Sequence, residues 1–198
     1  MSGIVTNFSD LDLTKTYTYS DYLLWQFSER VELIKGFILK MSPAPSSNHQ
    51  SVSFNLSDCF AQNFRRKPCR VFAAPFDVKL PIKSTIKKDT TIVQPDLCVI
   101  CDESKIDDNC CVGVPDLIVE IISPKNRKHD VETKFNLYLE AGVQEYWLVD
   151  PQDRMILIYS LKNDEYIGSK PYIEGMKIKS QLFPELDIDV DDVFYRVK

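Results

Sequence analysis

A glutamate lies inside an otherwise apolar stretch near the middle of the chain. In Leu117-Ile118-Val119-Glu120-Ile121-Ile122 the carboxylate is flanked by aliphatic residues on both sides, a composition typical of a strand that is covered on both faces. An uncompensated carboxylate in such a setting costs several kcal/mol, so it must be paired, protonated or bound to a cation. The pattern therefore indicates either a cation site or a buried salt bridge at Glu120.

A second carboxylate can join it. Asp96 opens the strand-like segment Pro95–Cys101, and if this segment pairs antiparallel with the one that contains Glu120, the two side chains become neighbours. Asp116 is excluded as a partner, because four residues of strand separate it from Glu120 by roughly 13 Å. Two carboxylates and a main-chain carbonyl suit Mg²⁺, with Mn²⁺ as an alternative, and such a metal activates water for phosphodiester hydrolysis.

A cation can complete this site. Lys134 lies on a predicted helix between Val131, Phe135 and Tyr138, which places it on the margin of the buried face, from where a long side chain can lean towards the sheet. Its ammonium group could orient the water or hold the scissile phosphate. We therefore expect Asp96, Glu120 and Lys134 to be the catalytic residues.

Periodicity and turn residues predict the elements that must position these side chains. Helices are expected over Ser20–Ser28, Ser47–Lys67 and Asp130–Ala141, and a hairpin over Val31–Met41 around Lys35-Gly36. Strands are expected over Arg70–Leu80, Pro95–Cys101, Pro115–Ser123, Glu145–Val149 and Met155–Leu161. Because a helix separates the third and fourth of these strands, they can run parallel in one mixed sheet.

The predicted fold class is thus α/β (α+β): a mixed central sheet flanked by helices, with an N-terminal hairpin and C-terminal strands. Residues 1–198 are expected to form a single domain, with a core over about 20–166 and peripheral strands and an acidic tail over 167–198. Only six glycines occur, without a Gly-rich phosphate loop or a GxSxG motif, so nucleotide-driven motors and serine hydrolases find no support.

The formal net charge of −5 is unfavourable for an enzyme that acts on nucleic acid, since affinity for phosphate comes largely from lysine and arginine. The cations are, however, concentrated between Ala61 and Thr90. We expect this segment to contact a nucleic-acid backbone, although a merely solvated charged face remains the alternative. The candidate nucleic-acid-binding residues are Arg65, Arg66, Lys87 and Lys88.

The six cysteines are expected to be reduced, because the sequence has no apolar run of membrane-spanning length and its first residues lack the features of a signal peptide. The expected location is the cytoplasm. Cys98 and Cys101 have CxxC spacing, which leaves a zinc site as a minor alternative. Residues three apart in a strand point to opposite faces, however, and this separates the two sulfurs.

Several short motifs together resemble the Uma-type restriction endonucleases, a branch of the PD-(D/E)XK nuclease superfamily. The similarity runs from about Tyr22 to Tyr166. Its motifs are Val31-Glu32-Leu33-Ile34-Lys35-Gly36, His49-Gln50, Ala74-Pro75-Phe76-Asp77-Val78, Pro95-Asp96, Glu120-Ile121-Ile122-Ser123-Pro124, Asp130-x3-Lys134 and Gly142-Val143-Gln144-Glu145-Tyr146-Trp147-Leu148-Val149-Asp150. The resemblance implies a restriction-endonuclease-like core, DNA as substrate, and Mg²⁺ held by Asp96, Glu120 and the carbonyl of Ile121.

One position departs from the superfamily pattern. The lysine that usually follows the glutamate is Ile122 here, and the resemblance transfers its role to Lys134 on the following helix. Glu32 and His49 are implied as supporting residues, although His49 could equally cap the helix that begins beside it.

Three hypotheses follow. The first is a Mg²⁺-dependent endonuclease, expected as a homodimer by analogy because cleaving a duplex needs two cuts. The second is a non-catalytic binding or regulatory module that keeps the nuclease fold. The third is a structural zinc protein.

Overall fold

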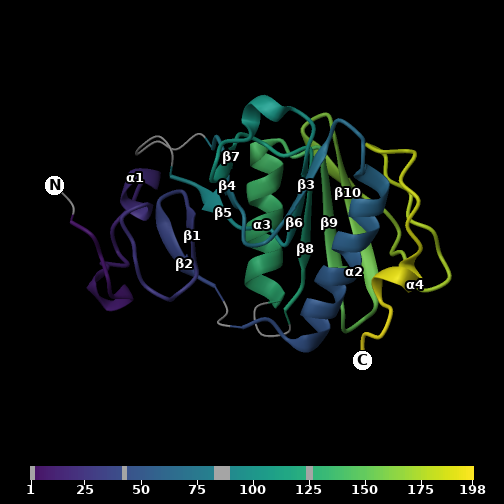
Figure 1. The fold of residues 1–198 in the computed structure, drawn as a ribbon, viewed down its shortest axis with the longest axis horizontal. Helices are drawn as coiled ribbons and strands as arrows, with labels where there is room; N and C mark the ends of the chain where they lie inside the picture. The colour runs from purple at the N-terminus through teal and green to yellow at the C-terminus, as the bar shows by residue number, and fades with distance from the viewer. Residues whose placement is uncertain (1–2, 42–43, 83–89, 124–126) are drawn as a thin grey trace.

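The computed structural model describes residues 3–41, 44–82, 90–123 and 127–198, and it contains two mixed β-sheets with few helices (Figure 1). The predicted α/β class is therefore confirmed. One sheet has the strand order β11-β10-β9-β8-β6-β3 and the other β2-β1-β5-β4-β7. The strands of the six-stranded sheet are β3 (Arg70–Ala73), β6 (Leu97–Ile100), β8 (Leu117–Ile121), β9 (Glu145–Asp150), β10 (Met155–Lys162) and β11 (Glu165–Gly168). Those of the five-stranded sheet are β1 (Val31–Ile34), β2 (Phe37–Lys40), β4 (Asp77–Lys79), β5 (Ile92–Val93) and β7 (Cys110–Val112).

The centre of the six-stranded sheet has the pairing that the sequence predicts. β6 and β8 are antiparallel, with Leu97 opposite Val119, and β8 and β9 are parallel, with Glu120 opposite Leu148. Apart from Glu120 in β8 and from Glu145 and Asp150 at the two ends of β9, the residues of these strands are apolar or aromatic on both faces, because both faces are covered. This register brings the start of β6 beside the end of β8, where Asp96 and Glu120 lie.

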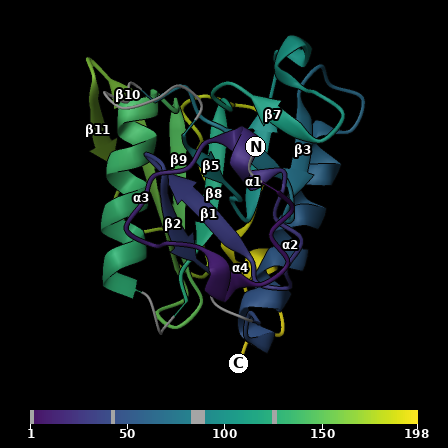
Figure 2. The same cartoon turned by 90° about the vertical axis from the view of Figure 1, so that its left-hand side faces the viewer.

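Two long helices cover the opposite faces of this sheet, as Figures 1 and 2 show from two directions. α2 (Ser47–Phe64) begins after its cap Ser46 and buries one apolar stripe in the core that contains Trp147. α3 (Arg127–Ala141) packs on the other face, around Tyr138 and Tyr146, and ends at Gly142, whose φ of 83° is a left-handed cap conformation. Among the described residues, no helix combines the length and the apolar character needed to cross a membrane.

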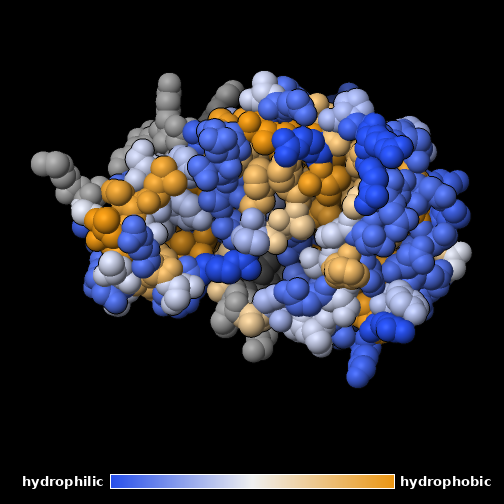
Figure 3. Space-filling view, in the orientation of Figure 1, coloured by the Kyte–Doolittle hydropathy of each residue, from blue (hydrophilic) through white to orange (hydrophobic). Residues whose placement is uncertain are grey.

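The N-terminal hairpin forms as predicted, with a turn at Lys35 and Gly36, where φ is positive at both positions. The helix expected over Ser20–Ser28 is shorter and begins earlier: α1 (Tyr19–Tyr22) starts after Thr18, which forms a capping box with Asp21. The lobe that carries α1, β1 and β2 exposes several large apolar side chains, seen as orange surface in Figure 3. These side chains are Ile4, Leu13, Leu23 and Phe37.

The strand expected over Arg70–Leu80 is divided. β3 ends at Ala73, a cis Ala74-Pro75 bond follows, and β4 begins at Asp77. Because β3 pairs with β6 while β4 pairs with β5 and β7, the two halves belong to different sheets. This segment therefore connects the two sheets.

The C-terminal part differs from the expected strand pair and acidic tail. Beyond β11, the described chain forms isolated bridges, such as Lys177 with Asp189, and a short helix α4 (Val190–Val193). Its apolar residues join the core on the α2 side of the sheet. These residues are Ile178, Phe183, Leu186, Ile188, Val190, Val193, Phe194 and Val197.

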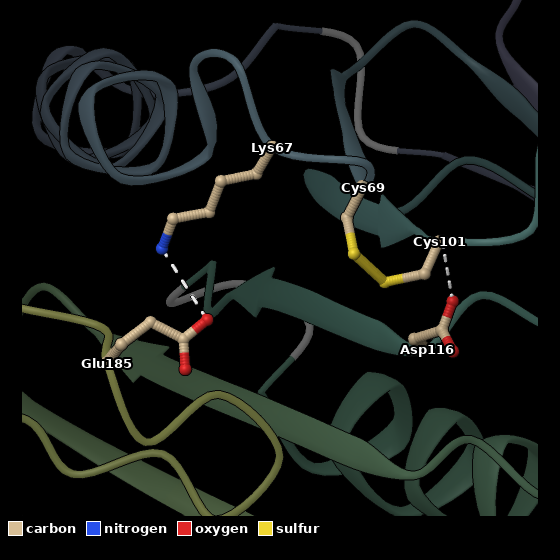
Figure 4. Close-up of a disulfide and its surroundings, with 5 residues drawn as sticks. All are labelled: Lys67, Cys69, Cys101, Asp116 and Glu185. Atoms are coloured by element: carbon tan, nitrogen blue, oxygen red, sulfur yellow. Dashed lines mark hydrogen bonds and ion pairs between the residues drawn. A yellow bond between two sulfur atoms is a disulfide. The ribbon is translucent and has the colours of Figure 1, made fainter.

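The expectation that all cysteines are reduced is wrong for one pair. Cys69 and Cys101 form a disulfide between the segment that precedes β3 and the end of β6 (Figure 4). Antiparallel pairing of β3 with β6 brings these residues together although 32 positions separate them. The disulfide also removes the zinc alternative, because the sulfur of Cys101 is bonded, while Cys98 is buried on the opposite face.

Candidate functional site

Asp96 and Glu120 are neighbours across β6 and β8. The Oδ2 atom of Asp96 accepts a hydrogen bond of 2.8 Å from the backbone N–H of Ile121, the residue after Glu120. This bond holds the Asp96 carboxylate at the end of β8. Asp116 lies at the opposite end of the same strand, where its Oδ2 accepts the N–H of Cys101 at 2.8 Å (Figure 4). The geometry that pairs Asp96 with Glu120 and excludes Asp116 is therefore observed.

Lys134 reaches the carboxylates from α3. Its Nζ donates to Oε1 of Glu120 at 2.9 Å and to Oε1 of Glu32 at 2.7 Å. Tyr138, one turn further along α3, donates its hydroxyl to the same Oε1 of Glu120. Both of these bonds use Oε1 of Glu120, and among the described residues no hydrogen bond is made to Oε2. The buried salt bridge that was the alternative to a cation site is thus present on one oxygen of Glu120.

Glu32 is the second partner of Lys134 and lies on β1, in the other sheet. Its side chain is 2% exposed, and its Oε1 also accepts the backbone N–H of Gln94 at 2.8 Å. Glu32 therefore connects β1 to the segment that carries Asp96. The N-terminal hairpin thus contributes the carboxylate of Glu32 to the site, and the family resemblance implies a supporting role for this residue.

The charges of the site are coupled. Burial raises the pKa of Glu120 above its ordinary value, the ammonium group of Lys134 opposes this rise, and the charge of Asp96 adds to it. Burial by itself lowers the pKa of Lys134, but Glu120 and Glu32 raise it further than burial lowers it. Lys134 is therefore a cation at neutral pH, and the repulsion between Asp96 and Glu120 is the kind that a divalent cation relieves.

His49 stands on the first turn of α2 and faces Asp96. Its Nε2 lies 3.4 Å from Oδ1 of Asp96, while its backbone N–H donates to Oγ of the cap residue Ser46. The capping role is thus performed by Ser46, and the imidazole is turned to the carboxylate. Burial lowers the pKa of His49, but its hydrogen bond to Asp96 and the charge of that carboxylate raise it by more.

These residues line one cavity of about 190 Å³. Its walls come from the hairpin, the first half of α2, the residue before β6, the end of β8, the first part of β9, and α3. Further lining residues, not singled out from the sequence, include Arg30, Gln94 and Tyr146. Tyr138 was also missed, although its spacing of four residues from Lys134 on one helix could have indicated it. Nothing in the sequence near Tyr146 distinguishes its hydroxyl from a core position.

The predicted DNA-binding residues are not part of this cavity. Arg65 and Arg66 are exposed directly after the last residue of α2, sixteen residues of chain from His49, or about 24 Å along a helix axis. Lys87 and Lys88 lie outside the described residues. Within the described ranges, no group of three or more His, Cys, Asp and Glu side chains is arranged to hold a metal ion. A metal here would therefore depend on two carboxylates together with main-chain oxygen and water.

Comparison with known proteins identifies proteins that are similar over most of the chain. A protein of Synechocystis sp., named only as uncharacterized, is 30% identical over 148 residues, which cover 73% of this chain and 74% of that protein. The crystal structure of a protein of Anabaena variabilis, titled a putative nuclease belonging to DUF820, has a similar fold, with a TM-score of 0.68 at 20% identity over 90% of this chain and 97% of that one. The family Uma2, described as "Putative restriction endonuclease", matches residues 19–191, so this chain belongs to the Uma2 family.

Proposed function

We propose that this protein is a Mg²⁺-dependent endonuclease that hydrolyses phosphodiester bonds in DNA. The observation that carries the proposal is the meeting of Asp96, Glu120 and Lys134, from three separate elements, at one cavity. Asp96, Glu120 and the carbonyl of Ile121 would hold the metal, or Mn²⁺ in its place. When bound, such an ion lowers the pKa of water and neutralises charge on phosphate.

The side chains of the chain itself have separate roles in this proposal. Glu32 positions Lys134, whose ammonium group binds an oxygen of the scissile phosphate or orients the water molecule that attacks it. His49 positions Asp96 through the contact of 3.4 Å between Nε2 and Oδ1. The guanidinium group of Arg30 is exposed and lines the cavity, which suits it to a neighbouring phosphate of the DNA backbone.

A DNA tract that extends beyond the cavity would meet further cations. Arg65 and Arg66 could bind backbone phosphates only if the DNA follows α2 to its last turn, and Lys87 and Lys88 belong to the same basic segment. Replacing both arginines by glutamine should then reduce the salt dependence of DNA binding. An unchanged dependence would remove them from the proposal.

We also propose a homodimer, because both strands of a duplex must be cut. Light scattering of the protein should then give twice the chain mass of 22.9 kDa, to which bound DNA adds its own mass. A monomer under those conditions would contradict the dimer but not the cleavage chemistry.

The central experiment is cleavage of plasmid DNA in Mg²⁺ and in Mn²⁺ by the purified chain. Asp96→Asn and Glu120→Gln should abolish cutting, and calorimetry should show weaker Mg²⁺ binding for Asp96→Asn. Asp116→Asn is the matched control, since it makes the same chemical change at the other end of β8. The proposal is wrong if contaminant-free protein cuts no DNA while Asp96→Asn binds metal as well as the parent.

A non-catalytic binding module is the second candidate. The observation that favours it is the ion pair of Lys134 with both Glu32 and Glu120, which compensates charge without any metal, together with Ile122 at the usual lysine position. This candidate predicts that Lys134→Arg and Glu120→Gln leave the cellular activity intact. Loss of that activity in both variants favours the nuclease.

A further inference from the structure

One hydroxyl group at the cavity has no hydrogen-bond partner among the residues that the structure describes. Across the described part of the chain, the only buried side-chain nitrogen or oxygen atoms without a hydrogen bond are Nδ1 of His49 and the hydroxyl of Tyr146. Tyr146 is 0% exposed, yet it lines the same cavity as Asp96 and Glu120. Tyr146 is therefore enclosed by protein and, as a lining residue, borders the space where a substrate would bind.

The position of Tyr146 follows from the parallel pairing of β8 and β9. Tyr146 lies opposite Ile118, and Leu148 lies opposite Glu120, so these side chains share the face that α3 covers. Aromatic rings surround Tyr146 and fix its orientation. The centroid distances are 5.2 Å to Tyr138, 5.9 Å to Tyr159 and 6.2 Å to Tyr166.

Packing does not explain the hydroxyl. Phenylalanine would fill the same space, and a buried hydroxyl without a partner lowers stability. The neighbouring Tyr138 shows the contrast, because its hydroxyl is engaged by Oε1 of Glu120. Unpaired donors that are held in place before a substrate binds are characteristic of sites that stabilise developing negative charge.

We propose that Tyr146 is a further catalytic residue, whose hydroxyl donates a hydrogen bond to a non-bridging oxygen of the scissile phosphate. This inference rests on the proposed nuclease function. Lys134 approaches the carboxylates from α3, whereas Tyr146 projects from β9, so the two donors reach the cavity from different elements. The hydroxyl remains protonated throughout, and it acts only as a donor to charge that increases during the reaction.

The test is Tyr146→Phe, which removes a single oxygen atom. The rate of DNA cleavage in Mg²⁺ should fall about 100-fold, as for the loss of one donor from an oxyanion site. The Kd for the same DNA in Ca²⁺ should change little, and the melting temperature of the protein without metal or DNA should stay the same or rise. Tyr159→Phe is the matched control: it removes a hydroxyl from a ring stacked on Tyr146 but outside the cavity, and it should cut like the parent.

The outcomes separate this inference from the proposed function. If the parent cuts DNA and Tyr146→Phe cuts at the parental rate, the inference fails and the nuclease proposal stands. If Tyr146→Phe melts below the parent, the hydroxyl has a structural role, and the inference is likewise wrong. If the parent cuts no DNA in Mg²⁺ or Mn²⁺, the nuclease proposal fails and the inference fails with it.

Discussion

The ion-pair triad of Glu32, Lys134 and Glu120 allows the most demanding test of the energetics, through Lys134→Met. Methionine keeps most of the length of the lysine side chain but removes its charge. The Lys134 side chain is 8% exposed and that of Glu32 is 2% exposed. The substitution therefore leaves two carboxylates in a largely buried site without their shared cation.

The expected loss of stability can be worked from the distances. With an effective dielectric constant of about 20, charges 2.7 Å and 2.9 Å apart attract by roughly 6 kcal/mol for each contact. The cost of desolvating Lys134 offsets much of this attraction, so the net effect is smaller. Removal of one member of a buried ion pair typically costs about 3–5 kcal/mol, because the remaining charge is left buried without a partner. We expect Lys134→Met to lower the free energy of unfolding by about that amount.

Restoring the charge balance should recover part of the loss. In Glu32→Gln combined with Lys134→Met, only one carboxylate of the triad remains charged, so the double variant should be more stable than the sum of the single changes predicts. The coupling free energy for such neighbours is about 0.5–3 kcal/mol.

Urea unfolding followed by tryptophan fluorescence measures all three variants, since Trp147 is fully buried in the core. A parental unfolding midpoint for Lys134→Met would contradict the expected loss of stability. Losses of the two single variants that simply add in the double variant would contradict the expected coupling.

Three other predictions concern residues outside the triad. Burial raises the pKa of Asp77 above 3.8, so ionisation of this carboxyl group reduces stability as the pH rises through the raised value. Asp77→Asn should therefore melt no lower than the parent at neutral pH. Thermal melts in which the variant melts below the parent would contradict this. Burial raises the pKa of the Cys98 and Cys111 thiols, so a thiol reagent should modify both only as fast as the protein unfolds. Rapid labelling of these thiols in the native protein would contradict this prediction. The disulfide between Cys69 and Cys101 spans 32 positions. Its reduction should lower the free energy of unfolding by about 3.7 kcal/mol, because the unfolded chain regains the entropy of the closed loop. Equal urea midpoints with and without reductant would contradict this.

Local sequence patterns were sufficient to predict the carboxylate pair at the centre of the site. An acidic residue in an apolar strand, a second at the start of another strand, and antiparallel pairing were enough to bring Asp96 and Glu120 together and to exclude Asp116. The hairpin at Lys35-Gly36 and the parallel pairing of β8 with β9 were equally predictable. These features depend on local periodicity, turn residues and strand direction, each of which can be inferred from a short segment of sequence.

The contacts that support this pair depend on how distant elements pack, and they were not predictable from the sequence. The bond between Lys134 and Glu32 joins residues 102 positions apart and depends on how β1 packs against α3. The disulfide arises because the expected strand after Arg70 divides at Ala74-Pro75 and its first half pairs with β6. The hydroxyl of Tyr146, which has no partner among the described residues, is buried by rings from other elements, those of Tyr138, Tyr159 and Tyr166. Such features depend on distances between elements, which no spacing within one segment encodes.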